Sequence, residues 1–342
     1  MTTSLSFSEC IALLPPSRHE ALKNEGATIL ADWIFTTHSG VLIFQNADTK
    51  FIAPYVRDPL LRRAHAGDGV SIALLNPQYR DGFSGSLDPD IYRLERALAV
   101  DQTNESLVLD EKTIVKWQLS AELSVGAIKE KLLDDAGFVN SPKLLGTIFW
   151  QNYLIASANA FIQGSQDGWT WCVEMAKTSN NGQWVTDLAD LTAHMHTALG
   201  GQVHGDFHVG QILKTPGSPK LWVIDFDGDP LTSYEEKIRP VPLIHDVASM
   251  CCSFFHVGAV AIKYGAALTD VKDWIVICCR DFTNRYFEAD QSWTISSNNQ
   301  IHQYMWQLEY RELTYANEFL PQWRYAPEFA MEFMEELGYG SH

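Results

Sequence analysis

Basic residues are scarce in this sequence. Its 342 residues include 25 Lys and Arg against 42 Asp and Glu, which gives a formal net charge of −17 at pH 7. A protein that binds a nucleic-acid duplex or an anionic membrane surface needs a basic face, because phosphate charges dominate that affinity. We therefore expect no nucleic-acid partner and no membrane partner. A nucleotide remains compatible with this charge, because a bound metal ion offsets its phosphates.

Several other features are missing. The sequence has no GxxxxGK[ST] phosphate loop and no CxxC pair of the kind found at zinc sites. Its first ten residues lack the basic and apolar regions of a signal peptide. The longest apolar stretch, residues 249–262, is interrupted by His256 and falls short of the ~20 residues that span a bilayer. We therefore expect a cytoplasmic protein without a membrane span.

The cysteines do not form a disulfide framework. Two adjacent pairs and two single residues are typical of free thiols in a reducing compartment. Four of them lie in apolar segments, where we expect them to pack as small hydrophobic side chains. These four are Cys251, Cys252, Cys278 and Cys279.

The hydrophobic pattern changes along the chain from strands to helices. Alternating segments predict strands at 28–35, 40–44, 50–54, 106–109, 113–117, 144–150 and 153–162. A helix is predicted near 124–136, and residues 184–199 carry an apolar stripe of helical spacing. Two short strands near 212 and 221–224 follow, and helical spacing dominates from Asp246 onward.

This order predicts an α+β protein with a bilobal, protein-kinase-like fold. We divide it into an N-terminal β-rich cap subdomain at 1–95, a β-rich N-lobe at 96–163 and a mainly helical C-lobe at 164–342. We expect the N-lobe to complete a nucleotide site. The C-lobe would carry the catalytic loop and the acceptor site.

Two acidic motifs carry the chemical signal, His-Gly-Asp-Phe-His-Val-Gly-Gln at 204–211 and Asp-Phe-Asp-Gly-Asp-Pro at 225–230. Phosphoryl transfer needs a carboxylate near the attacking hydroxyl, oxygen ligands for Mg²⁺ and positive charge on the phosphates. Asp206, Gln211 and Asp225 match the Asp-x-x-x-x-Asn and Asp-Phe-Gly order of protein kinases, with Gln in place of Asn. The Gln amide still offers a carbonyl oxygen to a metal ion.

These motifs resemble those of the maltokinase and actinobacterial glucosamine kinase group, in the aminoglycoside-phosphotransferase-like superfamily of eukaryotic-type kinases. The resemblance covers residues 95–335 and, on fewer residues, the cap subdomain. It implies ATP as co-substrate and Mg²⁺ as cofactor. It also implies that Asp206 is the catalytic base, that Gln211 and Asp225 hold Mg²⁺, and that His204 and His208 support the catalytic loop.

The resemblance further implies a strand lysine that binds the α- and β-phosphates of ATP. Lys116 follows an apolar strand at the right place in the order, although a solvated strand-end lysine has the same appearance. Its expected partner is Glu130 on the next helix, with Glu122 as the alternative and a plain surface charge also open. We assign the loop over the phosphates to residues 101–106 and the adenine-binding hinge to 156–163.

A C-terminal helix offers candidates for the acceptor site. Trp306, Glu309 and Tyr310 share one helical face, where an indole stacks on a sugar and a carboxylate binds hydroxyls or an ammonium group. We assign Trp306, Glu309 and Asp246 to the acceptor. An amphipathic helix that packs Trp306 in the core is the alternative for this face. Stabilisation of the catalytic loop is the alternative for Asp246.

The segment around Trp306 looks more like glucosamine kinases than maltokinases. We therefore predict a sugar kinase that converts glucosamine to glucosamine 6-phosphate. The alternatives are phosphorylation of maltose at its anomeric hydroxyl, an aminoglycoside acceptor, and an inactive pseudokinase that binds nucleotide or a partner.

Overall fold

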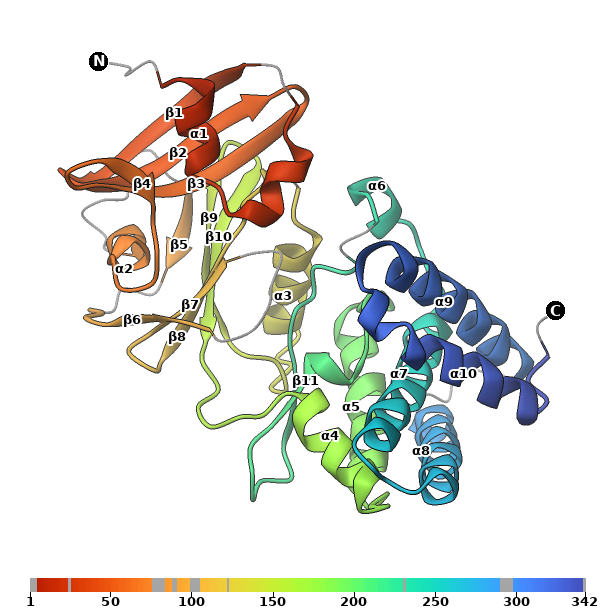
Figure 1. The fold of residues 1–342 in the computed structure, drawn as a ribbon. Helices are drawn as coiled ribbons and strands as arrows, with labels where there is room; N and C mark the ends of the chain where they lie inside the picture. Colours follow the sequence, from red (N-terminus) through yellow and green to blue (C-terminus); the bar gives the residue numbers. More distant parts are fainter. Residues whose placement is uncertain are drawn as a thin grey trace. The chain divides into compact units, whose positions relative to one another are not determined.

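The computed structural model describes residues 5–23, 26–75, 84–87, 91–98, 105–121, 123–229, 232–289 and 298–340. The chain forms two compact units (Figure 1). The first comprises residues 1–127 and 143–163, and the second comprises 128–142 and 164–342. Strands dominate the first unit and helices the second, as the hydrophobic pattern predicts.

Two antiparallel sheets build the first unit. The four-stranded sheet runs in the order β1 (Ala27–Thr36), β2 (Ser39–Asn46), β3 (Thr49–Arg57), β4 (Leu61–Arg63). The six-stranded sheet runs in the order β5 (Ser84–Leu87), β9 (Leu144–Trp150), β10 (Tyr153–Ala160), β8 (Thr113–Trp117), β7 (Glu105–Leu109), β6 (Glu95–Ala97). Short helices α1 (Phe7–Ala12), η1 (Pro16–Ala21) and α2 (Val70–Leu75) complete the described part of this unit.

The period of two along the strands creates the core of the first unit. In β8, Thr113, Val115 and Trp117 are buried, whereas the residues between them are partly exposed. Val115 and Trp117 pack with buried side chains of both sheets in one cluster. Lys116 points to the other face of β8 and stands across from Ser106 and Ser157 in the neighbouring strands.

Helix α7 (Ile244–Lys263) forms the centre of the second unit and packs against α4, α8, α9 and α10 (Figure 1). The other helices are α3 (Val125–Asp135), α4 (Gly168–Lys177), α5 (Trp184–Ala198), α6 (Tyr234–Lys237), α8 (Leu268–Ala289), α9 (Asn298–Phe319) and α10 (Tyr325–Glu336). The short turns η3 (Val209–Gln211) and η4 (Pro321–Trp323) and the hairpin β11 (Ile212–Lys214) and β12 (Leu221–Val223) lie between them. The predicted stripe of α5 is buried, as expected.

Helix α7 is longer than the apolar stretch seen in the sequence. By length and composition its 20 residues are enough to cross a membrane, so the sequence-based argument from length was wrong. However, 89% of its most apolar window is buried inside the protein, because four other helices cover it. It is the core helix of this unit. All six cysteines are free and buried, which confirms the prediction of unpaired, packed thiols.

The segment 128–142 corrects the predicted extent of the N-lobe, since it belongs to the helical unit. Leu133 packs in the helical core, the backbone N–H of Val223 donates to the carbonyl of Asn140 at 2.8 Å, and Lys129 reaches the catalytic loop. These contacts hold the segment to the second unit although strands flank it in sequence. The proposed division at residue 95 remains a prediction.

Candidate active site

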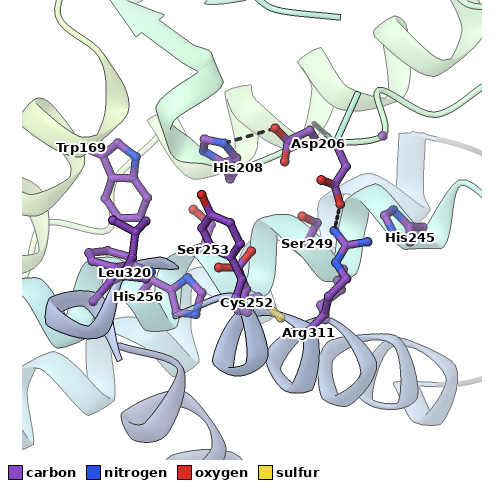
Figure 2. Close-up of a pocket in the computed structure, with 16 residues that line it drawn as sticks. Trp169, Asp206, His208, His245, Ser249, Cys252, Ser253, His256, Arg311 and Leu320 are labelled. Atoms are coloured by element: carbon purple, nitrogen blue, oxygen red, sulfur yellow. Dashed lines mark ion pairs between the residues drawn. The ribbon is translucent and has the colours of Figure 1, made fainter. Parts of the chain in front are cut away.

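A cavity of about 470 Å³ in the second unit contains the predicted catalytic aspartate (Figure 2). Its wall combines the catalytic loop with side chains of α4, α7, α9 and η4. The lining residues are Trp169, Gly205, Asp206, His208, Asp229, His245, Ser249, Cys252, Ser253, His256, Leu308, Arg311, Glu312, Tyr315, Leu320 and Trp323.

The catalytic loop presents Asp206 to this cavity by burying the residues around it. His204 and Phe207 are fully buried, and the His204 ring lies 5.4 Å from that of Phe207 and 4.8 Å from that of Phe226. Gly205 has φ +91°, in the left-handed region that glycine adopts without strain. Asp206 is therefore the half-buried, cavity-facing member of an anchored turn.

The hydrogen bonds of His204 fix its tautomer. Nδ1 accepts from the backbone N–H of Asp206 at 3.3 Å, so the proton sits on Nε2, which donates to the carbonyl of Ile224 at 3.0 Å. Burial lowers the pKa of His204 and keeps the ring neutral. His204 thus joins the catalytic loop to the segment that leads into Asp225, which supports its predicted structural role.

Asp246 anchors the same loop from the first turn of α7. Its carboxylate accepts from the backbone N–H groups of His204 at 2.5 Å and Gly205 at 3.1 Å, and from Nε2 of His196 at 3.0 Å. Burial would raise the pKa of Asp246, but the interactions with His196 and His245 outweigh it and hold the pKa well below its ordinary value. Asp246 is fully buried and does not line the cavity, so it acts on the loop and not on the acceptor.

The histidine that contacts Asp246 is itself held by a tyrosine. The hydroxyl of Tyr286 on α8 lies 2.8 Å from Nδ1 of His196 on α5, and both residues are buried. In the neutral ring, in which Nε2 of His196 donates to Asp246, Nδ1 accepts from the Tyr286 hydroxyl. Three helices therefore hold one carboxylate in place beneath the catalytic turn.

Gln211 and Asp225 are brought together by the β11–β12 hairpin. Ile212 pairs with Val223, and the N–H of Ile224 donates to the carbonyl of Gln211 at 3.0 Å, so both candidates lie at one end of the hairpin. Asp225 is exposed and has φ +62°, an uncommon backbone conformation for a residue other than glycine. Such strain clusters at functional sites.

This pair fits Mg²⁺ chemically. Magnesium takes hard oxygen ligands and is held by one or two carboxylates together with substrate phosphates and water, so it needs no cage of protein ligands. An amide oxygen from Gln211 and a carboxylate from Asp225 supply that donor set. In the described part of the chain no group of three or more His, Cys, Asp or Glu side chains forms a metal site.

His208 lies between the base and the metal candidates. Its Nδ1 accepts from the N–H of Gly210 at 3.0 Å, so the proton of the neutral ring is on Nε2. Nε2 lies 3.4 Å from the amide nitrogen of Gln211 and 3.8 Å from a carboxylate oxygen of Asp206 (Figure 2). The position supports the predicted role of His208 in ordering the catalytic loop.

The cavity has two chemically different ends (Figure 2). At one end Trp323 lies edge-on to Trp169 at 5.4 Å and to His256 at 5.9 Å between ring centroids. At the other end Arg311 of α9 forms an ion pair with the buried carboxylate of Asp229. The first end offers flat apolar surfaces and the second offers fixed charge.

The predicted acceptor residues lie behind this wall. Trp306 is buried and its indole N–H donates to the carbonyl of Tyr339 at 2.7 Å, while Glu309 is fully buried against His256. Neither residue lines the cavity, so the structure does not support direct sugar contacts for them. The face of α9 that does line it carries Leu308, Arg311, Glu312 and Tyr315.

The ATP-binding candidates occupy different units. Lys116 lies on β8 of the first unit, and Glu130 lies in α3 within the second. Their pairing stays a prediction. Glu122 and residues 101–104 of the assigned phosphate loop lie outside the described residues, and residues 105–106 begin β7. The assigned hinge at 156–163 includes the last residues of β10.

Sequence reasoning missed Trp169, His256, Arg311, Glu312 and Trp323 as cavity residues. A signal for two of them was present, because residues 308, 311, 312 and 315 also repeat at helical spacing. One helix thus has two faces that could line an acceptor site. An indole can stack on a sugar, which favours the face with Trp306, but an indole packs equally well in a hydrophobic core.

Comparison with known proteins gives one consistent result. No family model matches the chain. A glucosamine kinase of Streptacidiphilus jiangxiensis is 27% identical, over 84% of this chain and 87% of that protein. The chain resembles glucosamine kinases over most of its length. This similarity confirms the resemblance predicted from the two acidic motifs.

Solved glucosamine kinase structures have the same fold. One is similar with a TM-score of 0.80 at 23% identity, over 98% of this chain and 99% of that chain. Another, a glucosamine kinase in complex with glucosamine, ADP and inorganic phosphate, has a TM-score of 0.73 at 24% identity, over 98% of this chain and all of that chain. The α+β, kinase-like fold class predicted from the sequence is therefore confirmed.

Proposed function

We propose that this protein is an ATP-dependent sugar kinase that phosphorylates glucosamine to glucosamine 6-phosphate. The observation that carries the proposal is the anchored Asp206 at the wall of a cavity with aromatic and acidic side chains. The similarity to glucosamine kinases over most of the chain supports the choice of sugar. The volume lies within the range of small-molecule sites, ~300–1,000 Å³.

The reaction assigns a defined task to each group. The hydroxyl oxygen of the sugar attacks the γ-phosphorus of ATP, the bond from that phosphorus to the β–γ bridging oxygen breaks, and ADP leaves. Asp206 orients the hydroxyl and accepts its proton. Gln211 and Asp225 would hold Mg²⁺, which offsets charge on the phosphates when bound. Lys116 is proposed to bind the α- and β-phosphates.

The acidic wall suits a cationic acceptor. Asp206 and Glu312 face the cavity, while the charge of Arg311 is offset by Asp229. Burial, opposed in part by His256, raises the pKa of Glu312, and a bound ammonium group would favour its ionised form. We assign Glu312 to the amino group of the sugar through a charge-assisted hydrogen bond.

Release of ADP from Mg-ATP tests the proposal, with glucosamine, glucose, maltose and an aminoglycoside as acceptors. We expect the highest kcat/KM with glucosamine and a kcat lower by about 10²–10⁴-fold with Asp206→Asn. Preference for maltose or an aminoglycoside would refute the choice of sugar. No turnover with any of these acceptors would instead favour a pseudokinase.

Glu312→Gln tests the assignment of the amino group. The variant keeps the shape of the side chain and removes its charge, so it should raise the KM for glucosamine by about tenfold and leave that for glucose nearly unchanged. An equal change for both sugars would contradict the assignment. A cytoplasmic location is also proposed, since ATP is the co-substrate and the six thiols are free.

A further inference from the structure

A buried ion pair stands behind the aromatic end of the cavity and has no task in the reaction above. His256 on α7 approaches Glu309 on α9, with Nε2 at 2.8 Å from a carboxylate oxygen. The Glu309 side chain is completely buried, whereas the His256 side chain retains 9% exposure and lines the cavity. Glu309 is thus screened from the cavity by His256.

The carboxylate of Glu309 favours the protonated form of the histidine. Burial alone would lower the pKa of His256, but the carboxylate of Glu309 outweighs burial and raises it. Next to the pair, burial and then the charge of Glu309 raise the pKa of Cys252 far enough to keep its thiol protonated. An ionised carboxylate buried without a cationic partner costs several kcal/mol, so Glu309 and the imidazolium stabilise each other.

An imidazolium has two N–H groups, and Glu309 uses only one of them. Nε2 donates to Glu309, which leaves Nδ1–H as the second donor of a ring at the cavity wall. The same ring lies 5.9 Å from Trp323, edge to face. Because Trp323 and His256 both line the cavity, a sugar that contacts this indole lies near the imidazole ring.

From this geometry we propose that His256, held by Glu309, donates a hydrogen bond to a hydroxyl oxygen of the sugar acceptor. Glu309 is then a positioning residue that acts through His256. The proposal rests on the proposed sugar-kinase function and adds an orientation to it. The hydroxyl bound by His256 is then distinct from the amino group of the sugar, which we assign to Glu312.

The decisive variant is His256→Gln, because an amide N–H retains a hydrogen bond to Glu309 and the positive charge is lost. A hydrogen bond from a charged donor corresponds to about 10- to 100-fold in affinity. We expect the KM for the sugar to rise by at least about tenfold, with kcat and the KM for ATP within about twofold of the wild type. His194→Gln, an exposed histidine on α5, is the matched control and should change nothing.

Glu309→Gln and the double variant separate the two residues. If Glu309 acts through His256, Glu309→Gln raises the sugar KM less than His256→Gln does, and the double variant is no worse than His256→Gln alone. Fully additive effects would contradict the coupling. If His256→Gln does not fold, Glu309→Gln decides the matter, since an unchanged sugar KM overturns the proposal.

Quenching of tryptophan fluorescence by the sugar gives a binding measurement without turnover, because Trp169 and Trp323 line the cavity. If the wild type uses glucose or maltose in place of glucosamine, the proposed substrate fails and His256→Gln is tested with that sugar. An unchanged sugar KM in a folded His256→Gln variant overturns the proposal. So does a wild type that neither binds nor phosphorylates any sugar.

Discussion

Replacing Asp246 with Asn tests the anchor of the catalytic loop. One carboxylate oxygen accepts from His204 N–H at 2.5 Å and from His196 Nε2 at 3.0 Å, and the other accepts from Gly205 N–H at 3.1 Å. In the variant one of these oxygens becomes an NH₂ group that faces an N–H donor. Removing one partner from a buried charged network costs about 3–5 kcal/mol.

For a unit of this size, 1 kcal/mol shifts the Tm by about 2–4 °C, so the variant should melt about 6–20 °C lower. The kcat should fall by about 100-fold, since small displacements of a catalytic group have effects of this order. Thermal unfolding and ADP release measure the two quantities. Tyr286→Phe removes only the hydroxyl that bonds to His196 and should cost about 1 kcal/mol.

The difference between wild type and Asp246→Asn should depend on pH in a defined direction. The folded-state pKa of Asp246 lies below the ordinary value of 3.8. The stabilisation that ionised Asp246 gives to the folded state is therefore complete above pH ~4 and is lost as the pH falls toward the folded-state pKa. Urea unfolding at pH 7 and pH 3 measures the difference. A variant within about 1 kcal/mol of the wild type at pH 7, with normal kcat, would refute the anchor.

Three further predictions follow from the same structure. Asp206→Asn should lower kcat by about 10²–10⁴-fold with little change in sugar binding, and equal turnover would exclude Asp206 as the base. Gly168→Ala should lower the free energy of unfolding by about 1–3 kcal/mol, because a Cβ at this position would lie 1.9 Å from the carbonyl oxygen of Val209. Gly26→Ala is the control, because a Cβ at Gly26 would have no atom within 4 Å. The five thiols other than that of Cys252, which lines the cavity, should react with a thiol reagent only after unfolding, and fast labelling of more than one thiol in the native protein would contradict their burial.

The sequence predicts the fold and the catalytic loop well because both depend on local patterns. The alternation of apolar and polar residues predicts the strands of the first unit. The spacing from Asp206 to Gln211 and Asp225 predicts the catalytic loop and the hairpin that follows it. The burial of His204 and Phe207 on either side of Asp206, which lines the cavity, explains why these residue types occur in this order. Such information is contained within about 25 consecutive residues.

The acceptor site was less accessible to sequence reasoning because it is assembled from distant segments. Trp169 precedes the catalytic loop, His256 follows it within an apolar stretch, and Glu312 and Trp323 come from the C-terminal region. Helical spacing alone offered two faces of α9. The choice between them depended on which face α7 covers, and that packing has no signature in a single sequence.

The burial of every cysteine makes the wild-type chain a ready background for site-specific labelling. Reactive thiols introduced at exposed positions, such as Asp48 in the first unit and His194 in the second, would be far more open to a dye than the buried native cysteines. A donor and an acceptor dye on these two positions would report how the separation of the two units responds to ATP and to sugar. Because no native cysteine has to be replaced, the same preparation would serve for activity and distance measurements.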